Sequence, residues 1–324
     1  MFINRWCMLF LVATVLVVGA ASKRGLLCDH SAPIAVLRDH NCSLDNSRIL
    51  ANARPLQEHY SASSSNDDLM PDLWVRGAAS FLPALSGLIQ YGSGLSAEAS
   101  LRWRSMATFR AEADADTVSL KNALDKWHSD KADVVHNFHF VYGDIFRKLG
   151  RTNSLRTLEI GMGTNNPHLP STMGKRGSPG ASLRAFRDFL PRAAVHGGDI
   201  DRAILFQEDR IRTGFVDQLD LPTLDTLYTA MGSEPFDLII DDGLHALGAN
   251  ANTLLFALRS VRPGGFVVIE DVTVRCLPGI ALIDALLRST SPKIEAYLVK
   301  TGSIKEWGSR SSSLFMYVLR VPAK

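Results

Sequence analysis

Between residues 155 and 272 the chain repeats one pattern, a short apolar run that ends in glycine or in a carboxylate. The first run leads into Gly161-Met-Gly163, and two later runs lead into Asp241-Asp-Gly and Glu270-Asp271. Segments with helical spacing separate the runs. This alternation predicts an α/β fold with a doubly wound, mostly parallel sheet and helices on both faces. Doubly wound sheets bind nucleotides at the edge where the carboxyl ends of their strands meet.

Apolar periodicity gives the expected order of the elements. We expect helices at residues 117–127, 137–149, 181–190, 221–231, 250–261 and 282–287. We expect strands at residues 155–160, 194–198, 212–216, 236–240 and 265–269, and a closing antiparallel pair at 294–300 and 313–321. No firm pattern precedes residue 116. We therefore expect one domain at 116–324 after an N-terminal extension, partly helical or disordered, at 23–115.

Composition narrows the classes of function. The chain has 324 residues, of which 46% are apolar, so it can form a substantial core and is not globally disordered. Its net charge is only +2 and it has no dense Lys/Arg tract, so we expect no nucleic-acid partner. The expected partner is a small molecule at the sheet edge, and a homo-oligomer remains open.

An uncharged segment stands near the N-terminus. It comprises the sixteen residues from Trp6 to Ala21, between Arg5 and Lys23-Arg24, and it ends in small residues. This pattern predicts a secretory signal peptide at residues 1–22. A helix of that length spans about 24 Å, which is short of the hydrocarbon core of about 30 Å. The alternatives are an uncleaved membrane anchor, the only expected membrane contact, and a buried core helix. The first two place the protein in the secretory pathway or at a membrane.

The cysteines bear on the redox compartment. Cys28 and Cys42 pair if the chain enters an oxidising lumen, and otherwise they are two unrelated thiols. Cys7 lies in the leader, and we expect Cys276 to be a buried small apolar residue. The absence of a Cys-x-x-Cys motif excludes a zinc ribbon.

The turn Glu159-Ile-Gly161-Met-Gly163 lets a ligand approach the backbone closely, because glycine has no Cβ. It departs from the dinucleotide fingerprint, since Asn166 takes the place of the third glycine and the next helix begins only near Ala181. A diphosphate is bound at a helix N-terminus directly after the glycines. We therefore expect a nucleoside cofactor without a diphosphate. The intervening residues 164–180 form either a lid or an idle surface loop.

Acidic residues follow the next strands at positions that suit a nucleoside. Asp199 ends the second strand, where a carboxylate accepts both ribose hydroxyls, and Asp201 competes for that role. Asp217-Gln218 ends the third strand near the expected adenine, and Asp241 ends the fourth. The alternative for Asp199, Asp201 and Asp217 is to cap a helix N-terminus, which aspartate does readily.

The most specific prediction of a functional site comes from four residues, Asp242, His245, Glu270 and Asp271. Asp242 and Glu270 are 28 residues apart, one strand–helix–strand step, so they end neighbouring strands. Three carboxylates this close repel one another unless a cation neutralises them, and oxygen ligands with room for water suit Mg²⁺. We predict the three acids as metal ligands and His245 as a general base. The alternative is that the acids cap helices and that His245 is a solvated loop residue.

At these residues the chain resembles class I S-adenosylmethionine-dependent methyltransferases. Within that class it is similar to the metal-dependent macrolide-sugar O-methyltransferases and their cephalosporin-hydroxylase-like relatives, over roughly residues 125–320. The matching segments are Leu158–Gly163, Gly180–Arg184, Gly198–Asp201, Asp217-Gln218, Asp241–His245 and Ile269–Asp271. Ser129–Lys131, with His136 and Tyr142, resembles the segment that precedes the family's sheet.

The resemblance implies a Rossmann-like methyltransferase fold with S-adenosylmethionine and Mg²⁺ as cofactors. The implied reaction is methyl transfer to a hydroxyl of a sugar, a glycoside or another small molecule with a diol. By resemblance, the cofactor is held by Glu159, Gly161 and Asp199, Mg²⁺ is held by Asp242, Glu270 and Asp271, and the proton is taken by His245.

Two other classes of function remain open. One is a nicotinamide-dependent sugar oxidoreductase, which the missing third glycine and the late helix disfavour. The other is a secreted or membrane-tethered binding module that keeps the fold without turnover, which the intact set of acids and histidine disfavours. A Ser-His-Asp hydrolase is not expected, because no Gly-x-Ser-x-Gly elbow is present.

Overall fold

The computed structural model describes residues 102–132, 136–169, 171–273, 276–291, 293–305 and 311–323. These residues all belong to the second of the chain's two units, residues 76–324. The predicted leader, Cys28, Cys42 and most of the predicted extension lie outside the described residues. Among the residues described, we find no helix with the length and apolar character needed to span a bilayer.

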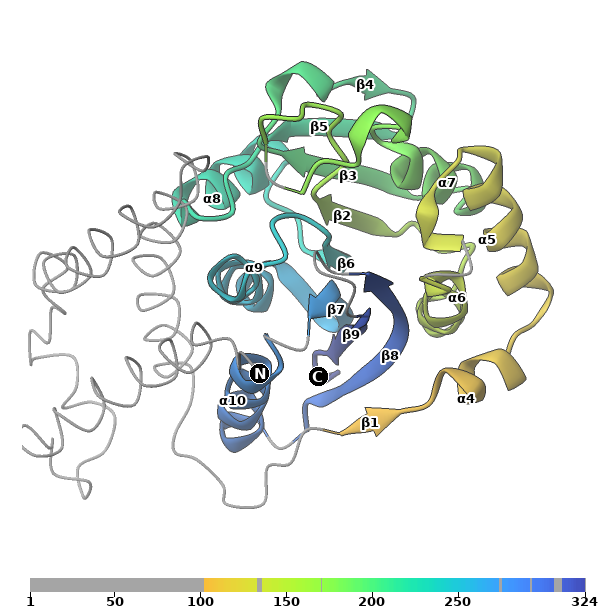
Figure 1. Ribbon diagram of the computed structural model, residues 1–324, viewed down its shortest axis with the longest axis vertical. Coiled ribbons are helices and arrows are strands. Elements are labelled where there is room, and N and C mark those ends of the chain that lie inside the picture. The colour runs from red at the N-terminus through yellow and green to blue at the C-terminus, as the bar shows by residue number, and fades with distance from the viewer. Residues whose placement is uncertain are drawn as a thin grey trace, which may run out of the picture. The chain divides into compact units, whose positions relative to one another are not determined.

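The strands of the described domain form one sheet in the order β1-β8-β9-β7-β6-β2-β3-β5-β4 (Figure 1). Along the chain they are β1 (Trp103–Arg104), β2 (Arg156–Ile160), β3 (Ala194–Asp199), β4 (Gln207–Glu208), β5 (Ile211–Phe215), β6 (Phe236–Asp241), β7 (Val261–Thr273), β8 (Glu295–Lys305) and β9 (Ser311–Arg320). The strands from β5 across to β7 pair in parallel, and β9 is antiparallel to both β7 and β8. This order confirms the predicted doubly wound fold and its closing antiparallel pair.

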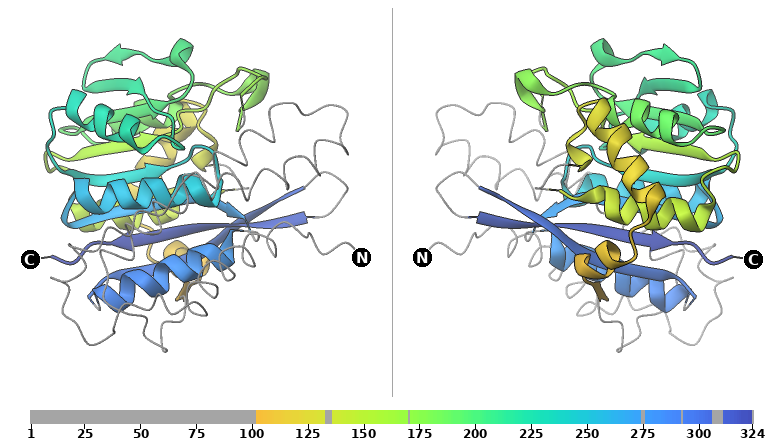
Figure 2. Two further views of the ribbon diagram at one scale, coloured as in Figure 1. Left: turned by 90° about the vertical axis from the view of Figure 1, so that its left-hand side faces the viewer. Right: turned by 90° about the vertical axis from the view of Figure 1, so that its right-hand side faces the viewer.

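Helices cover both faces of the sheet (Figure 1, Figure 2). One face carries α4 (Met106–Ala111), α5 (Ala115–Lys126), α6 (Phe138–Leu149) and α7 (Ala181–Phe189). The opposite face carries α8 (Leu221–Ala230), α9 (Leu247–Ser260) and α10 (Leu277–Thr290). The short 3-10 helices η2 (Asp130–Ala132), η3 (Gly174–Arg176) and η4 (Arg202–Ile204) lie in the connections.

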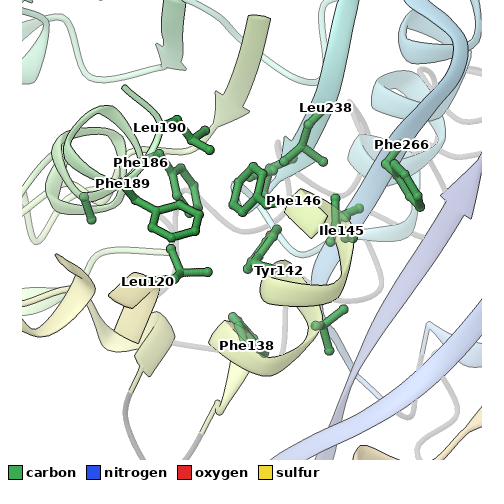
Figure 3. Close-up of a cluster of buried hydrophobic side chains, with 14 of the residues drawn as sticks. Leu120, Phe138, Tyr142, Ile145, Phe146, Phe186, Phe189, Leu190, Leu238 and Phe266 are labelled. Carbon is green, nitrogen blue, oxygen red and sulfur yellow. The ribbon is translucent and has the colours of Figure 1, made fainter. Parts of the chain in front are cut away.

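An aromatic cluster fills the space between the sheet and the helices α5, α6 and α7 (Figure 3). The ring of Phe186 meets the rings of Phe146 and Tyr142 edge to face, with centroid distances of 5.5 and 5.6 Å. Such pairs add to the stabilisation gained from burial alone. The packing fixes α6 against the sheet, and it places the hydroxyl of Tyr142 within reach of Glu270 on β7.

Polar contacts set the start of α5. The Asp114 carboxylate accepts a hydrogen bond from the Thr117 N–H at 2.8 Å, and the Thr117 hydroxyl accepts one from the Asp114 N–H at 3.3 Å. This reciprocal capping box satisfies two backbone donors of the first turn. The helix begins at Ala115, before residue 117, where apolar spacing predicted its start. Apolar spacing missed the first residues because the helix start is fixed by the polar cap.

The sheet extends further toward the N-terminus than the boundary expected at residue 116. Trp103 and Arg104 form β1 and pair in parallel with β8. In α4, the buried ring of Phe109 lies 6.1 Å from that of Tyr297 on β8. A strand of two residues is too short for a periodic signal, so the sequence pattern could not place it. In the described part of the chain the domain begins at β1.

The central strands are buried along their whole length. Every residue of β6 is buried, and β2 is buried at all positions but its first. Strands covered on both faces are expected to be almost wholly apolar. Glu159 on β2 and Glu270 on β7 are nevertheless 2% and 1% exposed. These two buried carboxylates mark the edge of the sheet that carries the chemistry.

Candidate active site

The site lies at the carboxyl ends of β2, β6 and β7, where the strand order reverses. The turns after β2 and β6 touch, since the Asp242 N–H donates a hydrogen bond to the Ile160 carbonyl oxygen at 2.8 Å. Gly161 has a φ of +88°, and a Cβ on it would overlap the carbonyl oxygen of Asp242. Only glycine fits a position with both constraints. The contact holds the glycine turn beside the acidic strand ends.

A small cavity, partly open to solvent, lies beside the glycine turn. Of the predicted site residues, Glu159, Gly163 and Asp242 line it. Its remaining lining residues precede α6, follow β2 or begin α7: Ser129, Asp130, Lys131, Met162, Met173, Ser178, Ala181 and Ser182. The space left for a ligand there is far smaller than the roughly 300–1,000 Å³ of ordinary ligand pockets, so this cavity has to widen for a nucleoside.

Glu159 is held at both carboxylate oxygens. The Ser182 hydroxyl, in the first turn of α7, donates a hydrogen bond to Oε2 at 2.5 Å. The ammonium nitrogen of Lys131 lies 3.1 Å from Oε1. Burial raises the pKa of Glu159, and the neighbouring Lys131 charge opposes that rise. Glu159 therefore reaches the cavity with its orientation fixed from α7 and η2.

Lys131 has a larger role in the site than the sequence indicated. Its Nζ atom lies 2.7 Å from Asp242 Oδ2 and 2.5 Å from Glu270 Oε2. Burial alone lowers the pKa of Lys131, but the three surrounding carboxylates outweigh burial and raise it well above its usual value. The partners Asp242 and Glu270 are 111 and 139 residues away along the chain, so local spacing carries no signal for these contacts.

Glu270 is bound by Lys131 and Tyr142. The Tyr142 hydroxyl donates a short hydrogen bond to Glu270 Oε1. Burial raises the pKa of Glu270 well above its ordinary value, and the Lys131 charge opposes that rise. Burial and the adjacent Glu270 also raise the pKa of Tyr142, which keeps its proton. Glu270 is not among the side chains that converge on one candidate cation position, so its role as a metal ligand stays a prediction.

Asp242, His245 and Asp271 do converge. Each offers a ligand atom, and these atoms all lie within 4.8 Å of one another. His245 Nδ1 and Asp271 Oδ1 are buried and make no well-aligned hydrogen bond among the described residues, although Asp271 Oδ1 has an ion-pair contact with His136. Buried polar atoms are nearly always paired in folded proteins, so these two atoms fit a bound cation or a bound hydroxyl group.

The backbone aims these side chains. The φ angles of His245 and Asp271 are +53° and +49°, in the left-handed region that residues other than glycine seldom adopt. The pairing of β7 with β9 shifts register between Ile269 and Val272, which makes Glu270 and Asp271 a β-bulge. Because of the bulge, Glu270 meets Lys131 and Tyr142, whereas Asp271 meets the Asp242–His245 side of the site.

Asp271 has two histidine neighbours, His136 and His245. Its Oδ1 atom lies 3.3 Å from His136 Nδ1, and His136 Nε2 lies 3.9 Å from Asp130 Oδ2. Burial raises the pKa of Asp271, but the contacts with His136 and His245 outweigh burial and lower it. Asp271 is therefore an anion at neutral pH. Cys276, predicted to be buried, is half-buried, with Sγ 3.9 Å from the carbonyl oxygen of His245.

Asp199 and Asp201 hold the turns around the glycines. Asp199 accepts hydrogen bonds from the Met162 N–H at 2.7 Å and from the Asp201 N–H at 2.8 Å. Asp201 accepts one from the Thr164 hydroxyl at 2.5 Å, and it caps η4 through the Ala203 N–H at 2.9 Å. Burial raises the pKa of Asp199, and these backbone donors oppose the rise. Neither side chain lines the cavity, so their cofactor roles stay predictions.

Gln218 and Asp241 form a buried network behind the turn after β6. The Gln218 amide donates to Asp241 Oδ1 at 2.7 Å, and its oxygen accepts from the Leu244 N–H at 2.7 Å. Asn250 donates to Asp241 Oδ2 at 3.0 Å. The network orders the segment that carries Asp242 and His245. Asp217 accepts a hydrogen bond from the Leu219 N–H at 3.0 Å, and its role toward a cofactor also stays a prediction.

Residues 164–180 fold back on their own ends. Thr164 accepts hydrogen bonds at its carbonyl oxygen from the Met173 N–H at 2.9 Å and from the Thr172 hydroxyl at 3.0 Å. The Gly180 N–H donates to the Met162 carbonyl oxygen at 2.8 Å. The sulfur of Met173 occupies the space where a Cβ of Gly163 would lie. The loop thus places a side chain in the cavity, which favours the lid over the idle loop.

The chain is similar to several curated O-methyltransferases. It is 36% identical over 162 residues to mycinamicin VI 2''-O-methyltransferase of Micromonospora griseorubida, a match that covers 49% of this chain and 37% of that protein. It is 34% identical over 171 residues to demethylmacrocin O-methyltransferase of Streptomyces fradiae, covering 52% of this chain and 39% of that protein. The chain thus spans less than half the length of these relatives. No protein-family model matches it.

Among solved structures, the MycE methyltransferase of the mycinamycin biosynthetic pathway, in complex with Mg and SAH, is 34% identical with a TM-score of 0.40. That match covers 47% of this chain and 37% of MycE. The strand order and the sequence relatives agree with the resemblance drawn from the motifs: over about half of its length, this chain is similar to curated O-methyltransferases.

Proposed function

We propose that the protein is an S-adenosylmethionine-dependent, Mg²⁺-assisted O-methyltransferase that acts on a hydroxyl of a sugar, a glycoside or another diol-containing small molecule. The observation that carries this proposal is the convergence of Asp242, His245 and Asp271 within 4.8 Å, at the end of the sheet that bears the glycine turn. The curated relatives are O-methyltransferases by name, so they act on hydroxyl oxygens.

The residues present fit both cofactors. Gly163 of the glycine turn lines the cavity, and no helix N-terminus follows the turn directly, which suits a nucleoside without a diphosphate. Asp242 and Asp271 supply the oxygen ligands that Mg²⁺ prefers. When bound, S-adenosylmethionine supplies an electrophilic methyl group, and Mg²⁺ lowers the pKa of a hydroxyl.

The chain's own groups then have distinct tasks. Asp242 and Asp271 would hold the cation, which would leave coordination positions for two oxygens of a diol. Because Mg²⁺ takes oxygen ligands, the ring nitrogen of His245 is left to accept the proton of the attacking hydroxyl. Glu159, fixed by Ser182 and Lys131, orients the nucleoside cofactor. Met173 and its loop exclude water from the reacting atoms.

The test is ligand binding followed by turnover. Isothermal titration calorimetry of the full chain with S-adenosylhomocysteine, in Mg²⁺ and in EDTA, should show binding that NAD does not reproduce. Labelled S-adenosylmethionine should then transfer its methyl group to a rhamnosyl glycoside or a catechol in a Mg²⁺-dependent manner. Binding of NAD in place of S-adenosylhomocysteine would favour the oxidoreductase. Stabilisation by S-adenosylmethionine and Mg²⁺ without product on any hydroxylated acceptor would favour the binding module.

The proposal includes a location. The uncharged segment Trp6–Ala21 supports passage into the secretory pathway or attachment to a membrane. N-terminal sequencing of the protein purified from its native host separates a cleaved signal peptide from a retained anchor. A mature chain that keeps Met1 and fractionates with the cytosol would contradict this part of the proposal.

A further inference from the structure

The turn between β6 and α9 carries Asp242 and His245, and other parts of the sheet edge hold it at two backbone positions. At the start of the turn, the Asp242 N–H donates a hydrogen bond to the Ile160 carbonyl oxygen on β2 at 2.8 Å. Directly before His245, the Leu244 N–H donates one to Gln218 Oε1 at 2.7 Å. The metal-side residue and the histidine of this turn therefore have different supports.

We propose that Gln218 is a positioning residue for the reaction, which fixes the backbone in front of His245 and so aims its imidazole at the attacking hydroxyl. This inference rests on the proposed function. The sequence predicted that Gln218 binds the cofactor, whereas its contacts favour a role behind the turn. Its side chain contacts the backbone of the turn and none of the side chains that converge on the candidate cation position.

The amide of Gln218 is held inside the protein. The residue is 7% exposed, and its nitrogen donates hydrogen bonds to Asp241 Oδ1 at 2.7 Å and to Thr253 Oγ1 at 3.0 Å. Its oxygen accepts from the Leu244 N–H. These partners fix which way the amide faces, because a carboxylate oxygen accepts and a backbone N–H only donates. A side chain held by three partners can hold the turn in one conformation.

The supports of Gln218 lie on α9 and at the end of β6. Asn252 on α9 donates a hydrogen bond to the Gln218 carbonyl oxygen at 2.8 Å, and both Asn252 and Thr253 are buried. The turn also lies directly against the amide, since a Cβ on Gly243 would overlap Gln218 Oε1. Gln218 thus fills the space between the turn and the helix that follows it.

The two supports of the turn predict different effects on binding and on turnover. Without the Gln218 amide, the Leu244 N–H loses its acceptor and His245 can shift. Asp242 keeps its hydrogen bond to Ile160. A displacement of about 1 Å at a reacting group can reduce the rate about 10²-fold. We therefore expect turnover to fall while the binding of S-adenosylhomocysteine and Mg²⁺ is retained.

The first test compares Q218M, which keeps the side-chain length and removes the amide, with the wild-type chain. Hydrogen–deuterium exchange, measured by mass spectrometry at single-residue resolution, should be at least about tenfold faster at the Leu244 amide. Transfer of a labelled methyl group to a rhamnosyl glycoside or a catechol should show a kcat lower by about 10²-fold. The KM for S-adenosylmethionine and the Kd values of S-adenosylhomocysteine and Mg²⁺ should stay within a few-fold of wild type.

The matched control is Y317F. The Tyr317 hydroxyl on β9 donates a buried hydrogen bond to Asp284 Oδ1 at 2.9 Å, so Y317F also removes a buried partner of a carboxylate. Both variants should lower the Tm by about a few degrees. Only Q218M should change the exchange of the Leu244 amide and the kcat.

The double variant Q218M/H245A tests whether Gln218 acts through the histidine. A positioning residue has no further effect on the rate once the residue that it positions is gone, so the double variant should transfer methyl groups at the rate of H245A. If Q218M fails to fold, G243A takes its place. Gly243 is not among the residues with positive φ, so alanine suits its backbone, and the added Cβ displaces Gln218 Oε1.

Four outcomes overturn the inference and leave the proposed function standing. Unchanged exchange of the Leu244 amide in Q218M rejects the contact. A rate for Q218M/H245A well below that of H245A, or an equal loss of kcat in Y317F, makes the effect of Gln218 merely structural. Loss of S-adenosylhomocysteine binding in Q218M alone assigns Gln218 to the cofactor. A wild-type chain that binds neither S-adenosylhomocysteine nor Mg²⁺ refutes the proposed function itself, and the exchange at Leu244 then still tests the contact.

Discussion

At the scale of single residues, the site combines buried charge with unusual backbone. Lys131, Glu159 and Glu270 are almost completely removed from water, and each is held by at least two partners. His245 and Asp271 instead keep a buried atom without a hydrogen bond in the described structure. The first group is satisfied by the protein alone, whereas the second has buried polar atoms that a ligand can still bind.

The H245A variant tests the proton acceptor. We expect it to bind S-adenosylhomocysteine like the wild type while the rate of methyl transfer falls by about 10²–10⁴-fold, the usual contribution of a general base. Calorimetry and a radiolabel transfer assay measure the two effects. H128A, which removes an exposed histidine before η2, is the matched control. Undiminished turnover in H245A would eliminate this role.

The G161A variant tests the contact between the two turns. Its Cβ would overlap Asp242 at a φ of +88°, so we expect a lower Tm and no S-adenosylhomocysteine binding. Gly232 has a φ of +96°, and a Cβ on it would have no neighbouring atom within 4 Å, so G232A carries the backbone cost alone, about 1–2 kcal/mol. Chemical denaturation compares the two. If G161A costs no more than G232A, the close approach of the turns is refuted.

At the scale of elements, the β-bulge in β7 directs two adjacent acidic side chains toward different parts of the site. A regular strand sends neighbouring side chains to opposite faces of the sheet, and the bulge with its left-handed Asp271 re-aims one of them along the edge. Glu270 therefore meets the ammonium under α6, and Asp271 meets His245. Glu270 and Asp271 are adjacent in sequence, yet their side chains have different partners.

The D271N variant removes the charge of Asp271 while keeping a residue that suits the left-handed backbone of the bulge. Asparagine tolerates left-handed φ as well as aspartate does, so the Tm in EDTA should stay within a few degrees of wild type. The rise in Tm that Mg²⁺ produces in the wild type should be lost, because one anionic ligand is gone. Differential scanning fluorimetry measures both, and D209N at an exposed aspartate is the control. A retained Mg²⁺ response would remove Asp271 from the metal site.

Helices and strands with periodic apolar residues were predictable from the sequence. The long-range contacts between their side chains were not. The strand 236–240 and the helix 181–190 were expected from apolar spacing, and β6 and α7 lie within one residue of those bounds. The short strand β1 offers no period to detect. Convergence of the acidic strand ends followed from the βαβ step. No local sequence pattern predicts the contact of Lys131 with Glu270, because this contact depends on how α6 and η2 pack against the sheet.

At the scale of the whole molecule, two buried histidines couple stability to pH. Burial lowers the pKa of His139 to about 4, and burial together with the Arg156 charge lowers the pKa of His196 to about 4, against 6.5 for the free side chain. The unfolded chain therefore binds protons below about pH 6.5 that the folded chain does not. Stability should be full above that pH and should decline as the pH falls toward 4.

The H196Q variant tests this coupling. It removes one of the two titrating groups, so the slope of unfolding free energy against pH between 6.5 and 4 should decrease by about one proton, or about 1.4 kcal/mol per pH unit. Urea denaturation at several pH values measures the slope. H128Q, at an exposed histidine, should leave it unchanged. An identical slope in H196Q and the wild type would mean that His196 is protonated in the folded state.

The position of Met173 has a kinetic consequence. Its thioether rests against Gly163, so binding of the proposed nucleoside requires this side chain or its loop to move aside. The observed affinity then equals the intrinsic affinity reduced by the fraction of molecules in which the loop has swung aside. For the proposed cofactor, we therefore expect that shortening the Met173 side chain increases the association rate more than it changes the dissociation rate.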